Sequence, residues 1–201
     1  MGVDKVILRA ILSTLAAIAV LFGFLFATLI IVYPSTMMEF TYSLGLEESS
    51  IKYAQRAYKR SNDIYYIAYA TQTAIEIEDY EKINSCGMKL ISDEEFNAFC
   101  EEKNAKNGDM AGDYEQYVYG QVCIAKYECE EKQTAVEYAF SFLEENEFPV
   151  NNAVVAVLIT SLRAEDEETV SLIEGKMKER KGTLSESEQV YYDEILRLIV
   201  G

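Results

Sequence analysis

The chain has 201 residues, enough for one domain of ordinary size and one further segment. Its 34 acidic and 18 basic side chains give a net charge of −16, which argues against nucleic acid as a ligand because phosphate contacts need Lys and Arg. The chain contains no histidine, and this removes the usual catalytic triads and most zinc sites. We therefore expect no enzyme activity, no catalytic residue, no metal and no cofactor, with carboxylate-only catalysis as the alternative.

An uncharged and apolar segment runs from Ala10 to Tyr33. At a rise of about 1.5 Å per residue, this segment is long enough as a helix to cross a hydrocarbon core about 30 Å thick. We expect a transmembrane anchor at residues 10–33, with a flank at residues 1–9 and a juxtamembrane linker at residues 34–46. A cleaved signal peptide is the alternative, but its apolar region is shorter and ends in small residues before the cleavage site. The sequence favours an uncleaved signal anchor.

The charges on either side of the apolar segment predict its orientation. Lys5 and Arg9 precede the segment, whereas the first basic residue after it is Lys52. The positive-inside rule then places residues 1–9 in the cytoplasm and the C-terminal domain in an extracytoplasmic compartment. We expect a single-pass membrane protein.

Small residues recur at every fourth position within the anchor, at Ala19, Gly23 and Ala27. This spacing lets two transmembrane helices approach closely, so it is typical of a homodimer or of a contact with another membrane protein. Small residues are also common in membrane helices that make no such contact.

The chain after residue 46 has apolar residues at helical spacing and no alternation typical of a strand. We predict an acidic, all-α domain over residues 47–201, in which about nine helices form successive helical hairpins. The segment 153–159 is apolar on every side, so its helix is expected in the middle of the domain. The expected helices are 47–61, 63–77, 79–91, 93–103, 113–131, 133–146, 151–164, 166–181 and 185–200.

Helix-capping side chains support several of these boundaries. Aspartates stand where N-caps would serve, at Asp79, Asp113 and Asp166. Capping-box spacing occurs twice, in Ser92 with Glu95 and in Ser185 with Glu188.

A weak internal similarity relates the two halves of this domain. Residues 51–54 (IKYA) resemble 136–139 (VEYA) at an offset of 85, and residues 77–81 (IEDYE) resemble 164–168 (AEDEE) at an offset of 87. These matches favour a duplicated helical unit, with chance similarity as the alternative.

The domain also resembles the tetratricopeptide-like (TPR-like) α-solenoid superfamily over residues 47–165. The resemblance is carried by Asp-Tyr-Glu at residues 79–81, echoed at 113–115, and by alanine and tyrosine positions on one helix pair, namely Ala54, Tyr58, Ala68 and Ala74. The chain lacks the family's 34-residue spacing, its Leu-Gly pair and its terminal Pro. The resemblance implies a helical array with a protein-binding or scaffolding surface on its concave face.

Four cysteines, Cys86, Cys100, Cys123 and Cys129, are candidates for disulfides in an extracytoplasmic domain. Cys123 and Cys129 lie six residues apart on one expected helix and on different faces, so they should not bond to each other. Two full pairings remain, 86–123 with 100–129 and 86–129 with 100–123. Buried thiols are the alternative.

Fifteen tyrosines and no tryptophan make tyrosine the natural candidate for a binding surface. A tyrosine ring supplies contact area and its hydroxyl a hydrogen bond, although packing with the hydroxyl at the surface gives the same pattern. Residues 107–118 resemble a calcium loop only in part, because Ala111 and Val118 stand where ligands are needed, so we expect a turn there. The candidate binding residues are Tyr58, Tyr65, Tyr66, Tyr69 and Tyr80.

These observations favour a membrane-anchored, non-enzymatic scaffold module that binds a protein or peptide partner. The alternative is an accessory subunit of a membrane complex that assembles through the transmembrane helix.

Overall fold

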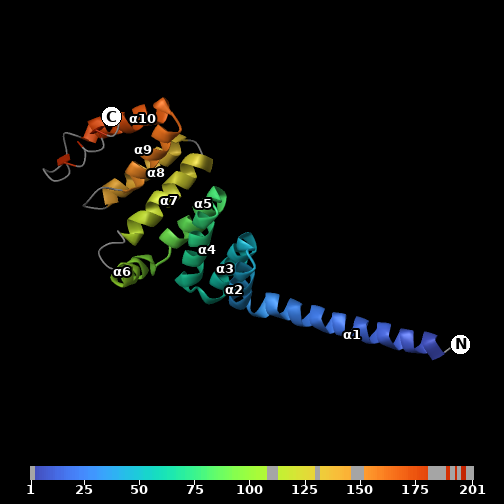
Figure 1. Ribbon diagram of the computed structural model, residues 1–201. Coiled ribbons are helices and arrows are strands. Elements are labelled where there is room, and N and C mark those ends of the chain that lie inside the picture. The colour runs from blue at the N-terminus through green and yellow to red at the C-terminus, as the bar shows by residue number, and fades with distance from the viewer. Residues whose placement is uncertain are drawn as a thin grey trace. The chain divides into compact units, whose positions relative to one another are not determined.

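The computed structural model describes residues 3–107, 113–129, 132–145 and 152–180, together with 189, 190, 193, 196 and 197. This described part contains ten helices and no strand (Figure 1), which confirms the all-α prediction. The chain divides into two compact units, Met1–Tyr66 and Ile67–Gly201.

Helix α1, Val3–Val32, contains the apolar segment. Its stretch Ile7–Val32 is long and apolar enough to cross a membrane, and the most apolar part of that stretch is not buried by the rest of the chain. The hydroxyls of Ser13, Thr14 and Thr28 donate to backbone carbonyls of the same helix, each at 2.9 Å. Such bonds satisfy polar side chains within the helix, as a hydrocarbon environment requires.

Two shorter helices follow α1 in the first unit: α2, Pro34–Ser43, and α3, Glu47–Ser61. Pro34 separates α2 from α1 because proline has no N–H to continue the hydrogen-bond ladder. α2 buries Met37, Met38 and Thr41 and packs on α3, where the Ser50 hydroxyl donates to the Met38 carbonyl at 2.9 Å. The segment 34–46, expected as a linker, therefore holds a packed helix and the turn around Gly45, whose φ is +69°.

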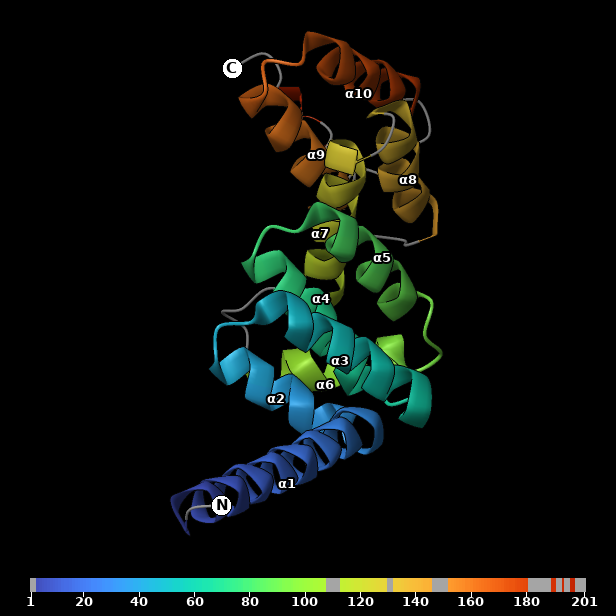
Figure 2. The same cartoon turned by 90° about the vertical axis from the view of Figure 1, so that its right-hand side faces the viewer.

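Helix α4, Ile64–Glu76, begins in the first unit and continues into the second. The second unit further contains α5, Tyr80–Ile91; α6, Phe96–Asn107; α7, Tyr114–Cys129; α8, Lys132–Glu145; α9, Asn152–Arg163; and α10, Glu167–Arg180. α7 is its central helix and packs on α5, α6, α8 and α9, while α10 packs on α8 and α9 (Figure 2).

One cluster of the core joins α7, α8, α9 and α10. α9 contributes Ala153, Val154, Val157 and Leu158, all at most 1% exposed. α9 packs on α7, α8 and α10, but it is not covered on every side, since Ile159 and Leu162 are 36% and 37% exposed. An apolar helix in a helical stack needs to bury only the faces that meet its neighbours.

Eight of the nine expected helices lie close to their expected ranges, and the ninth, 185–200, falls largely outside the described residues, as do Ser185 and Glu188. The capping box at Ser92 was wrong. Ser92 ends α5 and its hydroxyl donates to the Met88 carbonyl at 2.7 Å, while α6 begins only at Phe96. The Asp93 carboxylate instead accepts a hydrogen bond from the Glu95 N–H at 3.0 Å. The acceptor before α6 is therefore the neighbouring aspartate and not the serine.

The α4–α5 and α9–α10 turns have the same backbone hydrogen bonds. In the first, the N–H groups of Glu78 and Asp79 donate to Ile75 and Ala74, and in the second those of Glu165 and Asp166 donate to Leu162 and Ser161. The aspartate then accepts the N–H three residues later in both turns, at 3.1 Å from Lys82 and 3.3 Å from Thr169. These pairs keep the offset of 87 seen in the sequence, so the similarity extends to the turn geometry.

Candidate functional site

An open groove of about 510 Å³ lies within the second unit. Its wall is formed by the α4–α5 turn, by α7 and by the last turn of α9. Because α7 packs on both α5 and α9, the groove lies where three helices converge. Its lining residues are Ile75, Glu78, Tyr80, Ile83, Gln121, Ile124, Glu128, Thr160, Arg163 and Ala164.

The α4–α5 turn fixes two of the polar lining residues. Glu78 has φ +55°, a left-handed conformation that ends α4 and directs the chain into α5. Asp79 then caps α5, so Tyr80 occupies the first position of that helix. The capping aspartate also pairs with the Lys82 ammonium. Burial raises the pKa of Asp79, but the bonds from the ammonium and the backbone N–H of Lys82 together with its charge lower the pKa below its usual value.

Tyr80, which lines the groove, has a pKa above the usual value of a tyrosine. Burial raises the pKa of its phenol, and the carboxylates of Glu128 and Glu78 raise it further. The phenol therefore stays protonated at neutral pH and can donate a hydrogen bond into the groove.

The groove combines an aliphatic floor with charged sides. Ile75 and Ile124 offer apolar area above the buried Ile83, whereas among the described lining residues the carboxylates of Glu78 and Glu128 outnumber the single cation, Arg163. Such a surface suits an extended or helical peptide segment that carries aliphatic side chains and a basic one. Both glutamates are exposed to solvent, so they are not a desolvated acid–base pair.

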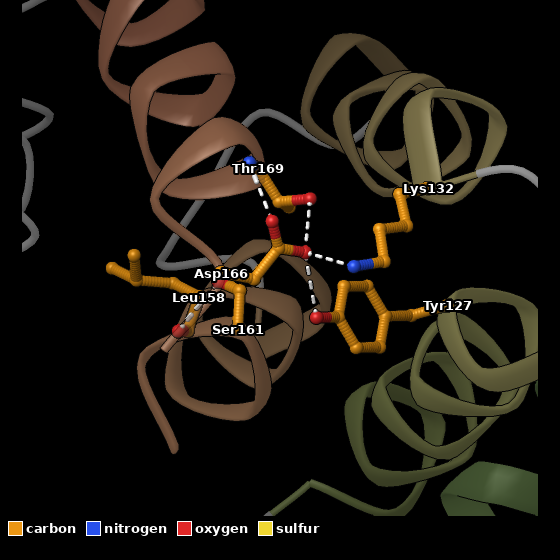
Figure 3. A network of polar contacts seen from close by, with 6 residues as sticks. All are labelled: Tyr127, Lys132, Leu158, Ser161, Asp166 and Thr169. Carbon is orange, nitrogen blue, oxygen red and sulfur yellow. Dashed lines mark hydrogen bonds and ion pairs between the residues drawn. The ribbon is translucent and has the colours of Figure 1, made fainter. Parts of the chain in front are cut away.

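A second polar cluster surrounds Asp166 (Figure 3). The Asp166 carboxylate accepts from the Tyr127 hydroxyl at 2.8 Å, from the Thr169 hydroxyl at 2.7 Å and from the Lys132 ammonium at 2.6 Å. Burial alone would raise the pKa of Asp166, but the bonds from Lys132, Thr169 and Tyr127 together hold it well below its usual range. The ring of Tyr127 also lies under the Lys132 ammonium, 5.4 Å away.

The Asp166 cluster is structural. The carboxylate caps α10 and joins that helix to the end of α7 and the start of α8, and its oxygens are occupied by these donors. Within the described residues, no Asp or Glu is among the buried residues. The buried carboxylate pair that catalysis by acids alone would need is therefore not found there.

The five candidate tyrosines are divided between the two units. Tyr80 lines the groove, but Tyr69, half-buried on α4, does not. Tyr58, Tyr65 and Tyr66 belong to the first unit, where the rings of Tyr65 and Tyr66 meet edge to face at 5.7 Å. The α7 and α9 residues of the groove were not expected, because no local pattern distinguishes them from other helix-surface positions.

The four cysteines are thiols in the structure. Cys86, Cys100 and Cys123 are buried and Cys129 is exposed. Burial raises the pKa of Cys100 and of Cys123 to about 12, which makes both thiols unreactive at neutral pH.

The remaining sequence candidates are not among the residues that line the groove. Ala19, Gly23 and Ala27 are exposed on α1, and a Cβ placed at Gly23 would meet nothing within 4 Å. Most of the calcium-like loop, residues 108–112, lies outside the described residues. In the part that the structure describes, no group of three or more His, Cys, Asp or Glu residues is arranged to hold a metal ion.

Comparison of this chain with protein-family models, with curated proteins and with solved structures found no match.

Proposed function

We propose that this chain is a membrane-anchored, non-enzymatic interaction module that binds a segment of a partner protein in the groove beside Tyr80. The observation that carries the proposal is the groove itself, in which three isoleucines lie beside two carboxylates, a phenol and a guanidinium. Interaction sites often combine apolar area with a few polar groups that fix orientation.

The charge of the groove favours a partner segment with a Lys or Arg next to aliphatic residues. Glu78 and Glu128 attract the cation, while the Arg163 guanidinium can donate hydrogen bonds to a carboxylate or a backbone carbonyl of the same segment. The second unit has 29 acidic and 12 basic residues in sequence, so its field also steers a basic partner toward it.

The arrangement within the cell follows from the sequence. α1 anchors the chain, residues 1–9 lie in the cytoplasm, and the acidic domain lies in an extracytoplasmic compartment. The TPR-like resemblance supports a scaffold role, because helical arrays of that kind present binding surfaces between successive hairpins.

Charge reversal in the groove tests the proposal. The full chain is solubilised from its native membranes in mild detergent, and co-purifying proteins are compared among wild type, E78K/E128K and the control E94K/E179K. The control makes the same charge change at two exposed sites outside the groove. We expect a set of partners that wild type and control retain and that E78K/E128K loses. Identical sets from all three would refute groove binding.

A different variant distinguishes assembly through α1 from binding in the groove. Gly23→Ile fills the exposed stripe of Ala19, Gly23 and Ala27 and changes no residue that lines the groove. Groove binding predicts that G23I keeps its partners. Loss of those partners in G23I, with retention in E78K/E128K, would favour the accessory-subunit alternative.

A further inference from the structure

Helix α2 runs crosswise to α1 where the apolar helix ends (Figures 1 and 2). α2 packs on both α1 and α3 within the first unit. A helix that leaves a membrane-spanning helix at a steep angle lies along the membrane surface and not above it.

Apolar side chains that remain about half exposed occur along α2 and its turn. Phe40, Leu44 and Leu46 are 48%, 57% and 51% exposed, and Tyr33 at the junction with α1 is 54% exposed. Tyr33, Phe40 and Leu44 are spaced by seven and four residues, which places them on one side of the helix. The buried residues of α2, Met37, Met38 and Thr41, lie on the adjoining side of the helix, and α2 packs on α3.

The charge of this region differs from that of the rest of the chain. Residues 34–66 contain four acidic and four basic residues, so they lack the net negative charge of the second unit. All four cations lie on α3 and are exposed: Lys52, Arg56, Lys59 and Arg60. The hairpin as a whole therefore has no net charge that would oppose its contact with a membrane.

Arg60 places positive charge where α1 ends. Its Nη1 donates to the carbonyl of Val32, the last residue of α1, at 2.9 Å. This bond satisfies a carbonyl that has no partner within the helix and favourably places a cation at the negative end of its dipole. If α1 spans the membrane, its end at Val32 lies at the boundary between the acyl chains and the head groups.

We propose that α2 and the α2–α3 turn lie in the head-group layer of the membrane that α1 crosses. Phe40, Leu44 and Leu46 enter the outer acyl region, Tyr33 lies at its edge, and the cations of α3 face lipid phosphates. The occupant of this apolar face is the bilayer, because the face continues from the end of α1 and has the aromatic residues typical of membrane interfaces. The proposal rests on α1 spanning the membrane and is independent of the groove.

Depth-dependent quenching tests this proposal with the full chain. Single cysteines replace Phe40, Leu44 or, as a control on α10, the exposed Ser171, all in a Cys129→Ser background. Each is labelled with an environment-sensitive dye under native conditions, where the three other thiols are buried. The labelled chains are reconstituted into phosphatidylcholine–phosphatidylglycerol vesicles and exposed to iodide in water or to shallow nitroxide-labelled lipids.

We expect lipid nitroxides to quench the dyes at positions 40 and 44 and iodide to quench the dye at 171. Agreement between positions 40 and 44 shows that the result does not depend on one substitution. An unchanged far-UV circular dichroism spectrum shows that the helices are retained. Iodide quenching at 40 and 44 equal to that at 171, without nitroxide quenching, would overturn the proposal.

Discussion

Glu78 and Glu165 hold the same left-handed backbone conformation, with φ of 55° and 54°, at the ends of α4 and α9. Each is followed by an aspartate that caps the next helix, Asp79 for α5 and Asp166 for α10. The two turns thus end one helix and cap the next with the same backbone conformation and the same residue type. Of the two glutamates, Glu78 lines the groove and Glu165 does not.

Replacing either glutamate with glycine relieves the cost of the left-handed conformation. That cost is about 1 kcal/mol for a residue with a Cβ, and the greater entropy of glycine in the unfolded chain offsets part of the gain. We expect E165G and E78G each to raise the free energy of unfolding by about 0.5 kcal/mol. Urea titration of the full chain in detergent measures this, and a loss of stability in both would contradict the account of the turns.

The two glycine variants also separate an effect on stability from an effect on partner binding. E78G removes a groove carboxylate, whereas E165G does not. We expect E78G to weaken recovery of the partner and E165G to leave it unchanged.

Gly87 sits where α5 meets α7. A Cβ at this position would lie 2.3 Å from Cγ2 of Val122, which is fully buried. We expect Gly87→Ala to lower the free energy of unfolding by about 1–3 kcal/mol, since overpacking a core forces neighbours to shift. Adding Val122→Ala should recover part of the loss that G87A causes, as double-mutant cycles would show.

Gly175 provides the matched control. It lies in α10, and a Cβ there meets nothing within 4 Å. Gly175→Ala should stabilise the domain by about 0.5–1 kcal/mol, because alanine favours a helix over glycine. Thermal unfolding of the two variants should therefore shift in opposite directions, and shifts of the same sign would refute the close contact of α5 with α7.

Most helices could be predicted because their signals are local. Apolar spacing and the aspartates at 79, 113 and 166 mark helices whose boundaries depend on a few neighbouring residues. α2 was missed because Pro34 and the polar residues after it are typical of a linker, and only its contacts with α3 make it a packed helix. The groove joins Glu78, Glu128 and Arg163 through packing of α5, α7 and α9, which a single sequence does not reveal.

Loss of the Asp166 carboxylate should destabilise the α7–α8–α10 junction. Asp166→Ala removes the cap of α10 and leaves the partly buried Tyr127 hydroxyl without its acceptor, so we expect a loss of about 1–3 kcal/mol. Tyr127→Phe removes one bond only and should cost about 1 kcal/mol. Chemical denaturation of both variants checks this order, and an Asp166→Ala variant as stable as wild type would contradict it.

The depressed pKa of Asp166 also predicts a pH dependence. Because the folded state lowers this pKa, the carboxylate stabilises the fold above its unfolded pKa of about 3.9, and that contribution is lost as pH falls through the lower folded value. The difference in stability between wild type and Asp166→Asn should be constant above about pH 5 and shrink below about pH 4. A difference that grows on acidification would refute the assignment.

Cys129 should be the one thiol that reacts readily in the native protein, since the other three are buried. A membrane-impermeant maleimide should label wild type once and Cys129→Ser not at all, and denaturation after reduction should expose four thiols in wild type. The same reagent on intact cells reports topology. Labelling from outside supports an extracytoplasmic domain, and labelling only after permeabilisation places the domain in the cytoplasm.

Site-specific photocrosslinking tests the groove most directly. A photoreactive amino acid replaces Gln121 within the groove or, as a control, Ser171 on the exposed side of α10, in the full chain in its native membrane. We predict a discrete adduct with a partner protein from position 121, absent from position 171 and lost when Glu128→Lys is added. Adducts that are the same from both positions, or that persist in the charge-reversed chain, would contradict binding in the groove.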